Sequence, residues 1–230
     1  MTARNASLVL VSLVVAAVCT RLGFWQLDRL EQRRAFNAFL RQRIAAPPVR
    51  FSGLPADTAK ARFRNVSLAG TYDYANEIVL TSRTRRGSPG VNIITPLRAA
   101  GDTAVLVNRG WVYAPDGMTV DLARWREGAS LNGTGHVETF SAARKGQAKS
   151  ATHPNAYRWL DRELLSQRLS YPLAPYYVVL AAGPSGESPK VPPRLDPPSL
   201  DEGPHRSYAI QWFSFATISI IGMFLLTRRK

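Results

Sequence analysis

The sequence predicts an α+β membrane protein in which two transmembrane helices flank a mainly β extramembrane domain with a few helices. Three observations support this class: an apolar segment near the amino terminus, a second one at the carboxyl terminus, and alternating β-branched patterns between them. A helix needs about 20 mostly apolar residues to cross a hydrocarbon core of about 30 Å. Period-two alternation is typical of half-buried strands. The chain therefore divides into two membrane anchors and one polar domain.

The first apolar segment predicts a transmembrane helix over residues 8–27, after a short tail of residues 1–7. Its first half consists almost wholly of Leu, Val and Ala. A short basic start with small residues at Ala16 and Ala17 also describes a cleavable secretory signal. We favour an uncleaved anchor, because Trp25 reads as part of an interfacial aromatic belt that continues the helix.

The second apolar segment predicts a transmembrane helix over residues 205–227, followed by a tail of residues 228–230. That tail is Arg-Arg-Lys, and Lys and Arg in short flanks set membrane topology. We therefore expect an integral membrane protein with both termini in the cytoplasm and the main domain in the periplasm or the equivalent compartment. Tyr208 and Trp212 are expected at the headgroup level, where aromatic rings are enriched.

We expect residues 28–182 to form the periplasmic domain. Asp28 to Ile44 has apolar positions at helical spacing, so we expect it to prolong the first helix into water as far as Pro47. Period-two patterns predict strands at Arg62–Tyr72, Glu77–Ser82, Asn92–Arg98, Ala104–Trp111, Gly135–Phe140 and Pro175–Ala182. Turn residues predict reversals at Tyr74–Asn76, Arg86–Gly90, Ala100–Asp102 and Asn132–Gly135.

Two further segments complete the domain. Asp161 is placed to cap a short helix that reaches about Leu169, with leucines on its buried face. Residues 183–204 contain seven prolines and few apolar residues, so they predict an extended connector that leads to His205.

Composition excludes several classes of function. The formal net charge of +14 suits an anionic partner, but the cations are dispersed and no nucleic-acid motif is present, so membrane lipid is the expected partner and nucleic acid is not. The single Cys19 excludes an internal disulfide and covalent c-type haem attachment. No nucleophile elbow, metal-binding helix or phosphate loop occurs, so we expect no enzyme. His136 and His153 are expected as surface or hydrogen-bonded side chains.

Four blocks in order along the chain carry a family resemblance. They are Leu22–Arg29 (LGFWQLDR), Gly90–Leu97 (GVNIITPL), Val105–Val112 (VLVNRGWV) and His205–Phe213 (HRSYAIQWF). This set resembles the signatures of the Surfeit locus protein family, the Surf/Shy cytochrome c oxidase assembly factors, in a bacterial-type form. The chain departs from the family pattern at Glu202-Gly203-Pro204, where members usually carry asparagine or a similar polar residue before the histidine. It also diverges between Val112 and Pro175.

The resemblance implies a non-enzymatic role in building haem-copper oxidase. It implies transient binding of haem a and help in placing it in the catalytic subunit of cytochrome c oxidase, with haem a synthase as a further candidate partner. An alternative stays open: a structural scaffold that holds oxidase subunits together without touching the cofactor. Asn108 to Trp111 is expected to shape a strand end and turn, with an exposed Trp111 that would serve partner docking in the scaffold alternative.

The resemblance also implies the residues of a haem site. His205 is the candidate axial ligand of the haem iron, since a neutral imidazole is a standard ligand there. Tyr208 and Trp212 share its helical face and are candidate walls of the site, together with Trp25. Arg29 is a candidate partner of a haem propionate or of a phospholipid phosphate. Trp25 and Trp212 fit plain interface anchors equally well, and we expect the two helices to pair near them.

Overall fold

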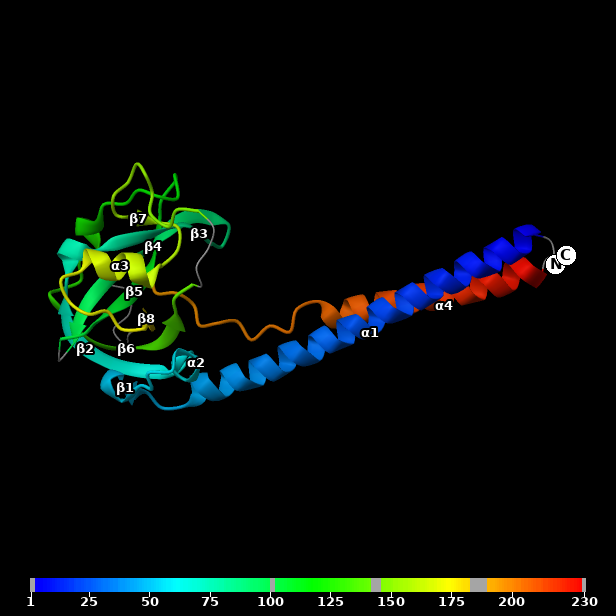
Figure 1. The fold of residues 1–230 in the computed structure, drawn as a ribbon, viewed down its shortest axis with the longest axis horizontal. Coiled ribbons are helices and arrows are strands. Elements are labelled where there is room, and N and C mark those ends of the chain that lie inside the picture. Colours follow the sequence, from blue (N-terminus) through cyan, green and yellow to red (C-terminus); the bar gives the residue numbers. More distant parts are fainter. Residues whose placement is uncertain (1–2, 100–101, 142–145, 183–189, 229–230) are drawn as a thin grey trace. The chain divides into compact units, whose positions relative to one another are not determined.

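The structure is a computed structural model that describes residues 3–99, 102–141, 146–182 and 190–228 (Figure 1). The chain divides into two compact units, Met1–Gln42 with Ser199–Lys230 and Arg43–Pro198. The first unit consists of two long helices and the second is a mostly β domain with a few short helices. This confirms the fold class predicted from the sequence.

The first unit contains helix α1 (Ala3–Ala45) and helix α4 (His205–Arg228). Both are long and apolar enough to cross a membrane by length and composition. Helix α1 continues well beyond its apolar half and ends just before Pro47. The helical spacing of residues 28–44 predicted this extension, and the proline explains why the helix stops.

The two helices pack against each other in antiparallel fashion (Figure 1). Near one end of the pair, Ser219 Oγ donates a hydrogen bond to the carbonyl oxygen of Ser12 at 3.0 Å. Further along, the rings of Phe24 and Phe213 meet edge to face with centroids 5.3 Å apart. A Cβ on Gly23 would lie 2.6 Å from the Phe213 ring. A small residue is therefore needed at this contact, as is common between helices in membranes.

The second unit is built on one eight-stranded sheet with the order β1-β2-β6-β8-β5-β4-β3-β7. Because β2 pairs with both β6 and β4, five of these strands close into a barrel. The strands are β1 (Val49–Arg50), β2 (Asn65–Tyr72), β3 (Ile78–Arg85), β4 (Ser88–Ala99), β5 (Ala104–Tyr113), β6 (Ser130–Thr139), β7 (Ala156–Tyr157) and β8 (Tyr176–Leu180). The short helices are α2 (Thr58–Ala61) and α3 (Arg162–Arg168), with 3₁₀ turns at Phe51–Gly53, Tyr74–Asn76 and Leu122–Trp125.

Apolar side chains form a core on each face of the barrel wall. The inner core draws on all five closing strands and includes Val66, Leu68, Leu97, Val105, Val107, Val137, Val178 and Leu180. The outer core lies under α3 and includes Ile78, Leu80, Ile94, Leu106, Tyr157, Leu160, Leu165 and Leu173. Each fully buried aliphatic side chain contributes about 1.5–3 kcal/mol relative to an exposed one. The barrel is therefore a rigid frame for the polar groups within it.

The six strands predicted from alternation are all present, with ends shifted by a few residues. Helix α3 is also confirmed, and the Asp161 carboxylate caps it by accepting a hydrogen bond from the Leu164 amide at 3.1 Å. The very short strands β1 and β7 were not predicted, because two residues are too few for alternation to show.

One predicted turn is present but shorter than expected, and another was wrong. Only Arg86 and Gly87 of the segment Arg86–Gly90 form a turn, since β4 begins at Ser88. Residues 132–135 lie inside β6 instead of in a turn. A Cβ on Gly135 would lie 2.3 Å from a backbone oxygen of β8, so glycine serves close strand approach at this position.

The remaining turn predictions had different outcomes. Tyr74–Asn76 is a 3₁₀ turn, as expected for a reversal. Residues 100 and 101 of the turn predicted at 100–102 lie outside the described residues, as do residues 183–189 of the predicted connector. The described part of the connector, residues 190–204, contains neither helix nor strand.

Candidate functional site

His205 is the first residue of α4, and its imidazole contacts a side chain of α1. His205 Nδ1 lies 2.8 Å from Gln26 Oε1. Gln26 is 8% exposed, and the contact is partly buried between the two helices. A glutamine carbonyl oxygen can only accept a hydrogen bond, so Nδ1 is the donor, and in the neutral imidazole Nε2 then keeps its lone pair. Nε2 is therefore the nitrogen that is able to bind a metal.

The segment before α4 is fastened to α1 by polar contacts. Arg34 and Glu202 form two hydrogen-bonded contacts of 3.0 Å each, and the Arg34 hydrogen bond holds the pKa of the Glu202 carboxyl below its ordinary value. The buried Asn37 donates to the carbonyl oxygen of Leu200 at 2.7 Å. His205 therefore enters α4 from a segment that is fixed to α1.

Gly203 leaves space beside Nε2 of His205. Its φ of +72° lies in the left-handed region that favours glycine. A Cβ at this position would lie 3.6 Å from His205 Nε2. Glycine at this position thus places no side-chain atom in contact with that edge of the imidazole.

The other four candidate haem-site residues lie on the helix surfaces. Trp25 is 47% exposed and Tyr208 is 46% exposed, while Trp212 is half-buried. The Arg29 guanidinium lies 5.6 Å from the centroid of the Trp25 ring and donates to Gln32 Oε1 at 2.9 Å. Both of these partners are uncharged, so these contacts leave the positive charge of Arg29 unneutralised.

The two helices meet near Trp25 and Trp212, as expected, although the rings in contact belong to their neighbours. At the level of Trp25 and Trp212, the ring contact between the helices is made by the neighbouring residues Phe24 and Phe213. The structure brings His205 to Gln26, a residue that sequence reasoning did not single out, although it stands in the Leu22–Arg29 block.

These residues fit a haem better than a bare metal ion. Across the described ranges, no three His, Cys, Asp or Glu side chains come together as an ion site. A haem macrocycle supplies the equatorial ligands of its iron, so one histidine suffices as an axial ligand. His205 offers a bare Nε2, and Trp25 and Tyr208 offer exposed aromatic surface on the same pair of helices. Arg29 adds a cation for an anionic propionate.

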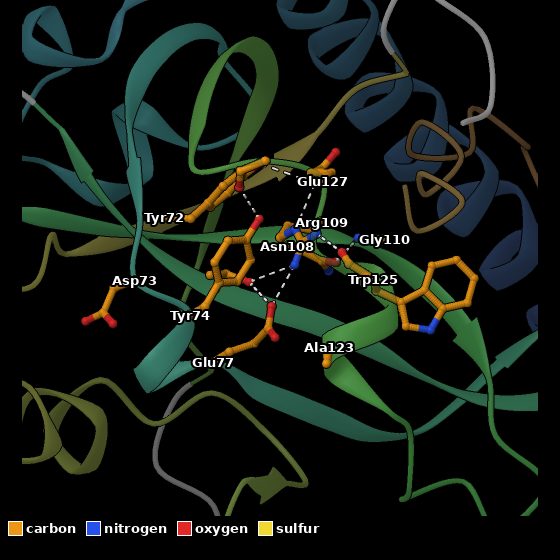
Figure 2. Close-up of polar contacts among 12 residues, drawn as sticks. Tyr72, Asp73, Tyr74, Glu77, Asn108, Arg109, Gly110, Ala123, Trp125 and Glu127 are labelled. Carbon is orange, nitrogen blue, oxygen red and sulfur yellow. Dashed lines mark hydrogen bonds and ion pairs between the residues drawn. The ribbon is translucent and has the colours of Figure 1, made fainter. Parts of the chain in front are cut away.

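The β domain contains a second polar cluster, around Arg109 (Figure 2). Arg109 lies on β5 and its side chain is fully buried. Its Nη1 donates to Glu77 Oε1 at 2.6 Å and its Nε donates to Glu127 Oε1 at 2.8 Å. Its Nη2 donates to the carbonyl oxygen of Trp125. A buried guanidinium with both carboxylates in hydrogen-bonding range is a structural ion cluster.

Aromatic rings and burial set the electrostatics of this cluster. The guanidinium lies 5.1 Å from the Tyr72 ring centroid and 5.2 Å from that of Tyr74. Burial, and next the Glu127 charge, raise the pKa of the Tyr72 hydroxyl. Burial also raises the pKa of Glu77, although hydrogen bonds from Thr95 and Arg109 oppose the rise.

Glu127 joins this cluster to the connector. Arg194 Nη2 donates to Glu127 Oε2 at 2.6 Å, and the Trp111 amide donates to the carbonyl oxygen of Pro193 at 2.9 Å. The connector can approach this closely because residue 110 is glycine: its φ is +141°, and a Cβ there would lie 2.4 Å from the Pro193 oxygen. Arg194 and Gly110 therefore clamp the connector onto β5.

The expected roles of Asn108 to Trp111 need correction. Strand β5 continues through this segment to Tyr113, and Asn108 and Arg109 are 3% and 0% exposed. Trp111 is half-buried, and its Nε1 donates to the carbonyl oxygen of Arg83 at 3.1 Å. The segment is therefore no docking surface. A local irregularity remains, because Asn108 Oδ1 accepts from the Gly110 amide at 3.1 Å where β5 slips in register against β4.

The other two histidines lie in the β domain. His136 is on β6, and burial lowers the pKa of its imidazole. It lines a cavity of about 470 Å³ together with Asn92 and Tyr177. His153 lies in a loop and its Nδ1 is 2.9 Å from Thr152 Oγ1, which confirms it as a hydrogen-bonded side chain.

A Glu127→Gln variant tests the charge in the Arg109 cluster. Hydrogen bonds from Arg194 and Arg109 outweigh burial and hold the pKa of Glu127 below its ordinary value. The ionised carboxylate therefore contributes stability that is fully present above the ordinary glutamate pKa of about 4.3 and is lost as pH falls through the lowered pKa. We expect the variant to be about 1–3 kcal/mol less stable than wild type at neutral pH.

Urea unfolding of the two proteins at several pH values measures this difference. The difference in unfolding free energy between the two proteins should vanish only below a pH of about 4. A gap that is the same at all pH values would show that the ionised form of Glu127 has no special role.

Together these features define a class of protein: a five-stranded β barrel with appended strands, carried on a chain with two terminal helices of membrane-spanning length. The sequence profile of the SURF1 family matches residues 13–217. The chain therefore belongs to the SURF1 family, which is known generally for oxidase assembly.

Curated relatives extend over almost the whole chain. It is 28% identical to a SURF1-like protein of Monosiga brevicollis, over 99% of this chain and 90% of the relative. It is 24% identical to a SURF1-like protein of Rickettsia felis, over 96% of each chain. A SURF1-like protein of Mycobacterium bovis is 25% identical, over 94% of this chain and 81% of the relative. The resemblance seen in the four sequence blocks is thus confirmed.

Proposed function

We propose that this protein is a non-enzymatic assembly factor that binds haem a transiently and assists its insertion into the catalytic subunit of cytochrome c oxidase. The observation that carries the proposal is the contact of His205 Nδ1 with Gln26, while Nε2 makes no hydrogen bond with the part of the chain that the structure describes. Membership of the SURF1 family supports the oxidase as the destination. Haem a synthase is the candidate donor in this proposal.

The chemistry of the proposed site follows from a few side chains. Haem would supply the iron, and His205 Nε2 would be the protein group that holds it. Trp25, Tyr208 and Trp212 offer aromatic surface to an apolar macrocycle. Arg29 is oriented by the Trp25 ring and offers its guanidinium to a propionate. One axial bond and exposed walls suit a carrier that must release its cargo.

The same proposal includes a membrane topology. The antiparallel packing of α1 and α4 supports placing both chain ends on one side of a membrane. The terminal cations of residues 228–230 favour the cytoplasm for that side. The β domain then lies on the periplasmic side of the inner membrane, and membrane lipid surrounds both helices.

A His205→Ala variant tests the function. Full-length protein purified in mild detergent from cells that make haem a is expected to show a haem a band in its reduced-minus-oxidised spectrum. The variant is expected to lose this band, because the substitution removes the proposed ligand and His205 is the only histidine on the two helices. His153→Ala is the matched control and should retain the band, since His153 lies in the β domain.

Two outcomes would count against haem binding at His205. A band unchanged in His205→Ala would place the ligand elsewhere. A colourless wild-type protein that still co-purifies with the oxidase catalytic subunit would favour the scaffold alternative.

A further inference from the structure

We propose that Gln26 is a positioning residue that selects the Nδ1-protonated tautomer of His205 and so directs Nε2 toward its ligand. This inference rests on the proposed function, because it explains how the imidazole is prepared to bind iron. It assigns to α1 a part in a site whose ligand stands on α4.

The first step of the argument is the geometry of the contact. The His205 Nδ1 to Gln26 Oε1 distance is 2.8 Å, which is within the range of a good hydrogen bond. The acceptor is an amide oxygen without a proton, so the proton of this bond must lie on Nδ1. A neutral imidazole carries one ring proton only, so Nε2 is left as a pure acceptor.

The second step is the burial of Gln26. Its side chain is 8% exposed, and an amide in that position loses its hydrogen bonds to water. A buried polar group without a partner costs about 1–3 kcal/mol, so breaking the bond to His205 is unfavourable. Rotation of the imidazole away from Gln26 is opposed for this reason, and the ring orientation is fixed along with the tautomer.

The third step is the support behind both residues. Arg34 and Asn37 of α1 hold the residues that precede α4 through Glu202 and Leu200. Gly203 leaves the Nε2 edge of the ring open. Metal-binding histidines generally donate their second ring nitrogen to a fixed acceptor, which sets the tautomer and raises the basicity of the ligating nitrogen. Gln26 meets this description.

Nitrogen NMR of haem-free, ¹⁵N-histidine-labelled full-length protein in detergent tests the tautomer directly. The chain has three histidines, so His205 is assigned by its absence from the His205→Ala spectrum. At about pH 8, well above the ordinary histidine pKa of about 6.5, wild-type His205 is expected to show a protonated Nδ1 and a bare Nε2. Gln26→Leu is expected to shift it to the Nε2-protonated form that free imidazoles prefer in water.

Two variants separate positioning from general packing. Gln26→Glu keeps an acceptor oxygen at this place and should keep the wild-type tautomer. Asn37→Leu removes another buried contact between α1 and the segment before α4, and it should leave the tautomer unchanged. An Nε2-protonated His205 in wild type overturns the inference, as does an Nδ1-protonated His205 in Gln26→Leu. The wild-type spectrum alone is decisive, so a Gln26→Leu protein that fails to fold does not block the test.

The haem-loaded protein provides a separate readout. We expect Gln26→Leu to lower the affinity for haem about 10–100-fold, the usual effect of removing such a supporting partner. Gln26→Glu should lower the reduction potential of the bound haem, because a carboxylate makes the imidazole a stronger donor. If wild type takes up no haem, the proposed function fails and the tautomer result still stands. If wild type and Gln26→Leu bind haem through His205 with equal affinity and show the same His205 tautomer, the inference about Gln26 fails while the proposed function stands.

Discussion

Replacing Arg109 with leucine is expected to lower the free energy of unfolding of the β domain by about 3–5 kcal/mol, the usual cost of breaking a buried ion pair on one side. Leucine removes the guanidinium that pairs with Glu77, whose side chain is 1% exposed. It also removes one of the two guanidinium groups that bind Glu127. The Glu77 carboxylate is then left buried without its cation, while Glu127 keeps its contact with Arg194.

Urea unfolding of the full-length protein in mild detergent measures this loss. Trp111, Trp125 and Trp159 lie in the β domain and report its unfolding by fluorescence. The matched control is Arg98→Leu, at an exposed arginine on β4 whose guanidinium lies 5.5 Å from the Tyr171 ring centroid. Loss of one exposed cation–π contact should change stability by about 1 kcal/mol or less. If the two variants lose equal stability, the ion cluster does not stabilise the barrel.

Replacing Gly110 with alanine is expected to release the connector from β5. The new Cβ would lie 2.4 Å from the Pro193 oxygen at a φ of +141°, so the chain must shift. Backbone strain of this kind costs about 1–3 kcal/mol. The hydrogen bond from the Trp111 amide to Pro193 and the contacts of Arg194 should open together.

Limited trypsin digestion detects this release, because cleavage after Arg194 requires its guanidinium to leave Glu127. The cleavage rate at Arg194 should rise roughly 10–100-fold, as expected when the open population grows by that strain energy. Cleavage after the exposed Lys190 is an internal reference. Gly87→Ala is the matched variant, since Gly87 also has a positive φ but a Cβ there meets nothing within 4 Å. Equal rates at Arg194 in all three proteins would contradict a clamp at Gly110.

The strands were predictable because period-two alternation is a local signal, but the barrel was not. Its closure depends on β2 pairing with β4 as well as β6. Gly70 permits that approach, since a Cβ there would lie 2.4 Å from the carbonyl oxygen of Arg98. A lone glycine in a strand indicates that another segment of backbone packs closely against it, but it does not identify that segment.

The candidate site was predictable only in part, because its contacts join residues that lie far apart in the sequence. His205 stands in a recognisable block, whereas its contact with Gln26 joins residues 179 positions apart. Arg109 gave a usable signal, because an arginine inside an apolar strand must find carboxylates if it is buried. The chain has 16 acidic residues, and nothing local marks Glu77 and Glu127 as the two that fold against it.

The closed barrel has a consequence for how the chain folds. Strand β2 pairs with β6, and β5 pairs with β8. In both pairs the second strand lies far along the chain from the first, at a similar separation, so the first strand has no partner at that edge until the second has formed. Pairings between such distant segments form slowly, because a long loop must be ordered before any contact stabilises it. A chain cut short before Tyr176 would keep β5 and β6 as open edges, which are prone to aggregate. A premature stop in this region is therefore expected to destroy the entire domain along with the second helix.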